Sequence, residues 1–375
     1  MAHASAPRTQ DRRADPPRRL HGLDAARALA IIGMLAVNVG PRKEDDQTAL
    51  AVLLYDLPHG RASILFMILA GIGMSLMTRK ARLYGAAMPW KTIIWRAALL
   101  IVGGLALQLL EHDISVILTY YGVLFVCGLP LLRAPTWLVS IIGLVSLIAG
   151  PLIWLGLQQY SSTTFDFLAP SLSDPGWTMV HATLLTGAYP LVVWLAPFCF
   201  GLVLGRGRLA DRDVQYQLIG WGLAAMIVPI GLSMTLIAFL GEPAASYGWD
   251  QLRLVEPHSQ MPLWLISSCG SAIVIIGFLL RGTSWVVARL SWLVSAGRLS
   301  LTIYVAHLFV LAWLIRPGPD SLLEGVIVSA IMSIGFVLAA HLWWRYLGTG
   351  PLERLLSWPP NFLHSGRSSA RPTDR

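Results

Sequence analysis

The chain has 375 residues, of which 55% are hydrophobic and 13% are charged, and its formal net charge is +8. Soluble domains carry about 25% charged residues, so this composition argues against a soluble fold. The cations lie in short segments between apolar runs, where orientation in a membrane and attraction to anionic lipid explain them better than nucleic acid does. We therefore expect the lipid bilayer, and no nucleic acid, as a partner.

Ten apolar segments follow one another, each close to the roughly 20 residues that a helix needs to cross the hydrocarbon core of a bilayer. We predict membrane-spanning helices over 23–40, 62–78, 92–110, 114–132, 136–156, 180–204, 216–240, 262–281, 296–315 and 322–344. The sequence thus predicts an all-α, polytopic integral membrane protein with about ten transmembrane helices.

The charges between the helices predict the orientation. With a cytoplasmic N-terminus, 22 Lys and Arg residues lie in inner segments and five lie in outer ones. Cytoplasmic segments are enriched in Lys and Arg, so both termini are expected inside. Arg outnumbers Lys 25 to 3, which suggests a high-GC bacterium. We place the protein in the bacterial inner membrane.

The two ends of the chain are polar. Residues 1–22 contain five arginines and the pair Pro16-Pro17, and we expect a disordered, basic cytoplasmic segment. No clean cleavage site follows the first apolar run, so it is interpreted as a retained helix. One transmembrane domain should occupy 23–347, and 348–375 should form a cytoplasmic tail. The three cysteines are too dispersed for a metal site, and we expect no metal.

The first predicted helix carries a polar stripe. Asp24, Arg27 and Asn38 lie within about 60° of one another around the helix, and Arg27 is about 16 Å from Asn38 along its axis. The stripe is interrupted by Ile31. Asp24 and Arg27 are either an ion pair that eases membrane insertion or part of a face that lines a cavity.

The outer end of the second predicted helix combines groups suited to catalysis. His59 stands near Asp56 and could act as a general base, or as a nucleophile that forms a transient acyl-imidazole. Arg61 and the helix N-terminus could hold an anion or polarise a carbonyl. The alternative is an ordinary loop entering a helix. Outer segments also hold His112, His181 and His258, an unusual concentration of groups that titrate near neutral pH.

Two later helices also carry polar or helix-breaking residues. Tyr189-Pro190 and Pro197 should kink the sixth helix, which membranes tolerate where protein or a cavity satisfies the freed backbone groups. In the ninth, Ser300, Tyr304 and His307 share a stripe, and His307 lies near the middle of the bilayer. An intramembrane histidine indicates a functional site, and the alternative is a neutral histidine bonded to a neighbouring helix.

Five motifs resemble known families. RRLHGLDAARALAIIGMLAVNVG resembles the opening signature of the bacterial relatives of heparan-α-glucosaminide N-acetyltransferase. GRASILFMILAGIGMSL resembles the second-helix signature of the related domain-of-unknown-function family 418. TGAYPLVVWLAPFCFGLVLGR, SAGRLSLTIYVAHL and GTGPLERLL are similar to later signatures of the same family. In the characterised acetyltransferase branch, the catalytic histidine of the first outer loop lies further from the helix and precedes an acid. Here Arg61 stands near the place of that acid.

This resemblance implies a membrane-embedded acyltransferase. It would move a small acyl group, such as acetyl, from cytoplasmic acyl-CoA to a hydroxyl or amine of a sugar, lipid or metabolite outside, with a homodimer left open. His59 would handle the acyl group, Asp56 would orient it, and Asn38 and Arg61 would polarise the carbonyl. The residues expected near acyl-CoA are Asp24, Arg27, Arg206, Tyr304 and His307.

The rival interpretation is a transporter or exporter without covalent chemistry. The stripes of the first and ninth helices would then form a conduit, and His307 would relay protons. Paired broken helices in the two halves of the chain would favour this class. The sequence shows a Pro-interrupted sixth helix and no convincing counterpart.

Overall fold

The computed structural model describes residues 19–40 and 57–357. Asp56 of the predicted site lies outside these residues, as do the first 18 residues and most of the predicted first outer loop. Within the described part of the chain every regular element is a helix, and the single β-bridge joins Phe167 to Gly187.

The helices follow the predicted apolar segments closely. In the first half they are α1 (His21–Val39), α3 (Arg61–Met77), α4 (Arg79–Tyr84), α5 (Trp90–Leu107), α6 (Leu118–Leu131), α7 (Thr136–Ser161), α8 (Gly176–His181), the π-helix η1 (Ala182–Thr186) and α9 (Leu191–Leu204). In the second half they are α10 (Arg212–Leu240), the 3₁₀-helix η2 (Trp249–Arg253), α11 (Pro262–Arg281), α12 (Thr283–Arg289), α13 (Ser291–Arg298), α14 (Ser300–Val310), the π-helix η3 (Leu311–Ile315), α15 (Leu322–Tyr346) and α16 (Pro351–Ser357).

Local sequence explains several helix ends. Asp211 precedes α10 and accepts a hydrogen bond from the backbone N–H of Asp213, and Ser321 does the same for Glu324 at the start of α15. Such caps satisfy N–H groups that have no partner inside the helix. Gly85 ends α4 in the left-handed conformation, which glycine adopts without strain.

The lengths and compositions of the helices are those of a multi-pass membrane protein. Among the described residues, seven helical segments are long and apolar enough to cross a membrane, with an eighth if α13 and α14–η3 count as one span. Two further apolar helices, α6 and α9, have only 14 residues each. Each of these segments overlaps one of the ten predicted ones, but in the sixth, predicted over 180–204, residues 187–190 are not helical and separate η1 from α9. The crossing of all ten stays a prediction.

The ninth predicted segment is the one that differs most from expectation. We predicted one straight helix over 296–315, whereas α13 and α14–η3 meet at an angle of 78°. The break lies at Leu299, whose backbone is not helical (φ −105°, ψ 23°). Gly297, two residues earlier, lies directly against the backbone of Asp24, which fixes α13 on α1.

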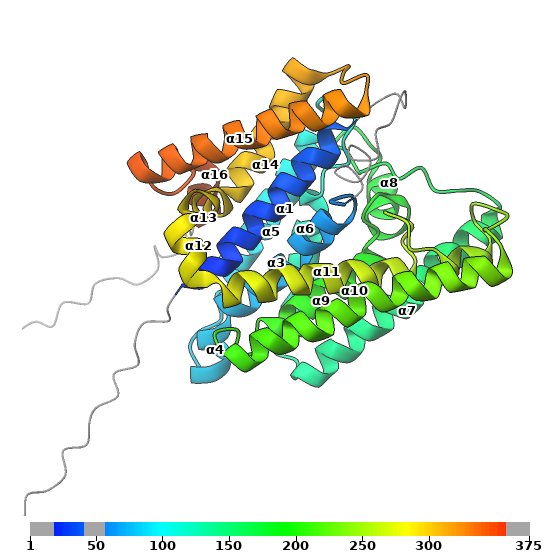
Figure 1. The fold of residues 1–375 in the computed structure, drawn as a ribbon, viewed down its shortest axis with the longest axis horizontal. Helices are drawn as coiled ribbons and strands as arrows, with labels where there is room; N and C mark the ends of the chain where they lie inside the picture. Colours follow the sequence, from blue (N-terminus) through cyan, green and yellow to red (C-terminus); the bar gives the residue numbers. More distant parts are fainter. Residues whose placement is uncertain (1–18, 41–56, 358–375) are drawn as a thin grey trace, which may run out of the picture.

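Helix α1 lies in the middle of the bundle. It contacts α3 and α11 on one side and α13, α14 and α15 on the other (Figure 1). Outside this group, α10 packs along α11, α7 along α9, α9 along α3 and α6 along α5. We call the end where α1 finishes and α3 begins the outer end, and the opposite end the inner end, after the predicted orientation.

Backbones come very close where α3 crosses α9. A Cβ atom added to Gly71 would lie 2.7 Å from the backbone nitrogen of Leu202, and one added to Gly201 would lie 2.9 Å from the carbonyl carbon of Ile68. Real Cβ contacts are essentially never this short when backbone is the neighbour. Small residues at such crossings let transmembrane helices approach closely. Here they fix α9 against α3, the helix that begins two residues after His59.

Candidate functional site

At the inner end, one buried carboxylate collects several cations. Asp24 is 2% exposed, and its oxygens lie 2.9 Å from Nε of Arg19 and 2.9 Å from Nη1 of Arg27. Nε of Arg298 is 3.6 Å away and Nδ1 of His21 is 3.8 Å away. The expected Asp24–Arg27 pair is therefore part of a larger cluster in which positive charge exceeds negative charge.

Arg206 does not join the Asp24 cluster through any of its hydrogen bonds. Its guanidinium donates to the carbonyl oxygens of Leu131 at 2.7 Å and Ala134 at 2.9 Å. These bonds tie the inner end of α9 to the connection between α6 and α7. Arg206 thus lies at the predicted inner end, as expected. There it binds the connection between α6 and α7, whereas Asp24 and Arg27 belong to α1.

Near the outer end, the stripes of α1 and α14 meet. The side-chain nitrogen of Asn38 lies 3.0 Å from Nε2 of His307, which is fully buried. The ring of Tyr304 contacts that of His307 at 4.9 Å, and its hydroxyl accepts a hydrogen bond from the backbone N–H of Ile117 at 3.2 Å. Nδ1 of His307 has no hydrogen-bond partner among the described residues. Helices α1, α6 and α14 are therefore linked by polar groups inside the bundle.

Arg316 joins three segments at the outer end of the bundle. Its guanidinium donates to the carbonyl oxygens of Asn38 at 2.8 Å, Val39 at 3.1 Å and His112 at 3.0 Å. Arg316 also lines an open cavity of about 690 Å³, together with Glu111 and Asp113. Arg316 thus links the wall of this cavity to the backbone of Asn38.

His112 is held in one protonation state. Its Nδ1 accepts a hydrogen bond from the backbone N–H of Ile114 at 3.0 Å, so Nε2 carries the proton and donates to the carbonyl oxygen of Leu107 at 3.0 Å. Burial lowers the pKa of His112, and the nearby charge of Arg316 lowers it further, although the bond to Leu107 opposes this. His112 is therefore a neutral group that shapes the cavity wall.

His59 lies beside a second histidine at the outer end. The ring centroids of His59 and His258 are 5.3 Å apart in an edge-to-face arrangement. His258 belongs to the segment between η2 and α11, and its backbone has a positive φ of 57°. Burial lowers the pKa of His258 to about 3, with a smaller contribution from His59. A neutral imidazole is therefore available next to His59 throughout the physiological pH range.

Aromatic side chains contact His258, one member of this pair. The ring of His258 contacts those of Trp264 at 5.8 Å, Tyr189 at 6.1 Å and Trp194 at 6.4 Å. The indole N–H of Trp194 donates to Gln260 at 2.8 Å, which fixes the loop that carries His258. We call the residues Tyr189, Trp194, His258 and Trp264 the aromatic box.

Arg61 points away from the position expected for it. Its guanidinium donates to the hydroxyl of Ser267 at 3.2 Å and to the carbonyl oxygen of the same residue at 3.3 Å. Asn38 binds α14 and Arg61 binds α11, so these two predicted carbonyl-polarising groups act on different helices. The histidine pair and the Asn38–His307 pair are thus two neighbouring clusters.

Tyr121 of α6 is a buried polar residue between α6 and α3 that the sequence analysis did not single out. It is 7% exposed, its ring contacts Phe66 of α3 at 5.0 Å, and its hydroxyl has no hydrogen-bond partner among the described residues. It lies within electrostatic range of Arg27, Tyr304 and Tyr189. Tyr121 is therefore a buried polar side chain of α6 in the interior of the bundle. The Tyr120-Tyr121 pair was visible in the sequence, but aromatic residues in an apolar segment are usually core.

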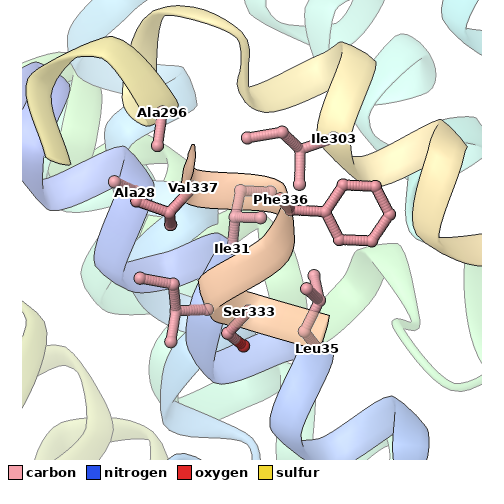
Figure 2. Close-up of a pocket in the computed structure, with 9 residues that line it drawn as sticks. Ala28, Ile31, Leu35, Ala296, Ile303, Ser333, Phe336 and Val337 are labelled. Atoms are coloured by element: carbon pink, nitrogen blue, oxygen red, sulfur yellow. The ribbon is translucent and has the colours of Figure 1, made fainter. Parts of the chain in front are cut away.

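Beside Ile31, the α1 stripe faces side chains that are apolar except for Ser333. A cavity of about 10 Å³ lies between α1, α14 and α15, where Ile31 and Leu35 face Phe336 and Val337 (Figure 2). This volume is close to the smallest that holds one water molecule, and an apolar lining keeps such a cavity dry. The part of the stripe at Ile31 therefore borders a small, nearly apolar cavity.

No group of three or more His, Cys, Asp or Glu residues in the described part of the chain is placed to hold a metal ion. No curated protein matches the sequence. Residues 204–358, which include α10 to α16 with His258 and His307, match the family model described as protein of unknown function (DUF418), and this match supports that family for the chain.

Proposed function

We propose that the protein is a membrane-embedded acyltransferase that uses a cytoplasmic acyl-CoA and an acceptor at the outer face. The observation that carries the proposal is the His59–His258 pair at the outer end of α3, in which His258 belongs to the aromatic box. The resemblance of the first-helix motif to bacterial relatives of heparan-α-glucosaminide N-acetyltransferase supports the same activity. The acceptor is a hydroxyl or amine of a sugar, lipid or metabolite.

In the first step, an unprotonated ring nitrogen of His59 attacks the carbonyl carbon of the thioester. The new C–N bond replaces the C–S bond, and coenzyme A leaves as a thiolate that takes up the proton lost from the other ring nitrogen of His59. The acceptor then attacks the acyl-imidazole, the C–N bond breaks, and the proton of the acceptor passes to a ring nitrogen. His258 remains neutral because of its low pKa, so it can orient His59 without adding a positive charge beside it.

The path of the thioester is supported by the polar groups between the two ends. Positive charge around Asp24, contributed by Arg19, Arg27 and Arg298, suits the phosphates of coenzyme A at the inner end. Tyr121, near Arg27, would then face the thioester arm on its way outward. In this proposal Arg298, 3.6 Å from Asp24, contributes to the phosphate site, whereas Arg206 binds carbonyl oxygens elsewhere at the inner end.

The decisive experiment measures release of coenzyme A from acetyl-CoA by the purified protein in lipid nanodiscs, with envelope extract as acceptor. His59→Ala should lower the rate about a hundredfold or more, the usual effect of losing a positioned acid–base group. His258→Ala should lower it as well, because His59 loses its neighbour. The matched control is His181→Ala, an outer histidine that stacks on Trp177 away from the box. Equal rates in the wild-type protein and His59→Ala would refute the proposed chemistry.

A transporter is the second candidate, favoured by a specific observation. The broken α13–α14 segment carries His307, which is fully buried against Asn38 beside the outer cavity. Broken helices at a buried polar site are typical of secondary transporters. If the wild-type protein releases no coenzyme A, and proton-coupled solute flux into proteoliposomes is lost in His307→Ala, transport is the function.

A further inference from the structure

The C-terminal motif GTGPLERLL has no role in the proposed chemistry, but it ends in contact with a functional helix. The carboxylate of Glu353 in α16 accepts hydrogen bonds from the backbone N–H groups of Leu301 at 2.8 Å and Thr302 at 3.0 Å. The hydroxyl of Thr302 donates to the other oxygen at 2.5 Å. Glu353 therefore caps the N-terminus of α14 from a separate helix.

Helix α14 needs this external cap. The residue before it, Leu299, has no side chain able to accept a hydrogen bond, and the 78° break separates α14 from the last turn of α13. The first N–H groups of a helix have no partner within it, and a carboxylate there also interacts favourably with the helix dipole. Glu353 supplies both contributions.

The rest of the motif explains how Glu353 reaches this position. Gly348 turns the chain after α15 with a φ of 74°, a conformation that costs glycine little. A Cβ atom on Gly350 would collide with the Glu353 carboxylate and lie 2.8 Å from the hydroxyl oxygen of Thr302. Pro351 is the first residue of α16, where its missing N–H costs nothing. These residues of the motif all serve the contact with α14.

The other end of α16 is fixed to α5. The indole N–H of Trp95 donates to the carbonyl oxygen of Leu355 at 2.9 Å, and Nε of Arg96 donates to that of Leu356 at 3.1 Å. Donors at the C-terminal carbonyls of a helix complement its dipole. Helix α16 is therefore a short brace that joins α5 to the start of α14 at the inner end.

We propose that Glu353 is a positioning residue: by capping α14 at its break, it sets the rotation and height of α14, so that His307 meets Asn38 and Tyr304 meets Ile117. Those two contacts lie further along the same helix, toward the outer end. The proposal depends on the proposed function only for the role of Asn38, Tyr304 and His307 in catalysis or transport. The placement of α14 itself is tested without any activity assay.

The experiment combines Glu353→Gln with Asn38→Ala in purified protein in nanodiscs. Hydrogen–deuterium exchange over residues 299–310 should rise in Glu353→Gln by between about two- and thirtyfold, the range expected from losing a helix cap. The rise should extend beyond Thr302 to the turn that carries His307. Because both substitutions loosen one helix, the fall in Tm of the double variant should be clearly smaller than the two single falls combined, whereas independent distant sites add.

The matched control is Glu324→Gln, which alters a carboxylate in the first turn of α15 at the other end of the bundle. It should leave exchange over 299–310 unchanged. If Glu353→Gln does not fold, Thr302→Val removes one of the three contacts and should show the same pattern in weaker form. Additive Tm changes, or faster exchange confined to Leu301 and Thr302, would show that Glu353 is only a local cap. Neither result depends on release of coenzyme A, so the proposed function stands or falls separately.

Discussion

The crossing of α3 and α9 gives a prediction that depends on backbone geometry alone. Gly201→Ala places a Cβ atom 2.9 Å from the carbonyl carbon of Ile68 and closer still to its oxygen. Both atoms belong to the helix backbone, so no side-chain rotation relieves the clash, and the two helices must separate. Over-packing of this kind typically costs about 1–3 kcal/mol, and the rigid neighbour puts this site at the upper end, about 3 kcal/mol.

A second glycine provides the control. Gly220 lies inside α10, and a Cβ atom there would meet nothing within 4 Å. Gly220→Ala should therefore keep stability or raise it by about 1 kcal/mol, the difference in helix propensity between the two residues. The assay is thermal unfolding in detergent, followed by tryptophan fluorescence. If Gly201→Ala unfolds at the wild-type temperature, or if Gly220→Ala falls equally, the close backbone contact between α3 and α9 is not what stabilises this crossing.

Three further predictions concern charge and orientation. Because the pKa of His258 falls from its ordinary 6.5 to about 3 in the folded protein, the unfolded state binds the extra proton between these values. Stability should thus be unaffected by His258 above pH 6.5 and should fall as pH drops toward 3, and Tm against pH should show a weaker fall in His258→Phe. Arg27→Leu should lower the free energy of unfolding by only about 1 kcal/mol, because Asp24 keeps Arg19 and Arg298 as partners. Asp24→Leu leaves three cations without their carboxylate and should lower it by about 3 kcal/mol. Equal losses for the two variants in chemical denaturation would contradict this. Single cysteines at the exposed outer positions Thr164 and Glu242 should react with an impermeant thiol reagent in intact cells. Single cysteines at the exposed inner positions Ala86 and Ala210 should react only after lysis.

The helices were predictable because their signals are local. An apolar stretch and the charges that flank it identify a transmembrane segment without knowledge of its neighbours, and the observed helices coincide with the predicted segments. The 78° break at Leu299 was not predictable, because it depends on the contact of Gly297 with α1 and on the cap from Glu353, 54 residues further along the chain.

The candidate site was predictable only where its parts lie on one helix. The Asp24–Arg27 pair and the Tyr304–His307 contact follow from helical spacing. The approach of His258 to His59 joins residues 199 positions apart, and no periodicity reports such a contact. Charge predicts an inner position for Arg206, but its carbonyl partners depend on how α9 meets α6, which charge does not report.

The shortness of α6 and α9 has a consequence for the predicted membrane crossing. Each has 14 residues, so it spans about 21 Å, against a hydrocarbon thickness of about 30 Å. Hydrophobic mismatch of this size is relieved by local thinning of the lipid or by water entering at the helix ends. These two helices carry Tyr121 and Trp194, so with both helices crossing as predicted the apolar layer would be thin beside these two residues. A membrane voltage would fall across this shorter distance, and a charge moving past Tyr121 would experience a steeper field than one in the surrounding lipid.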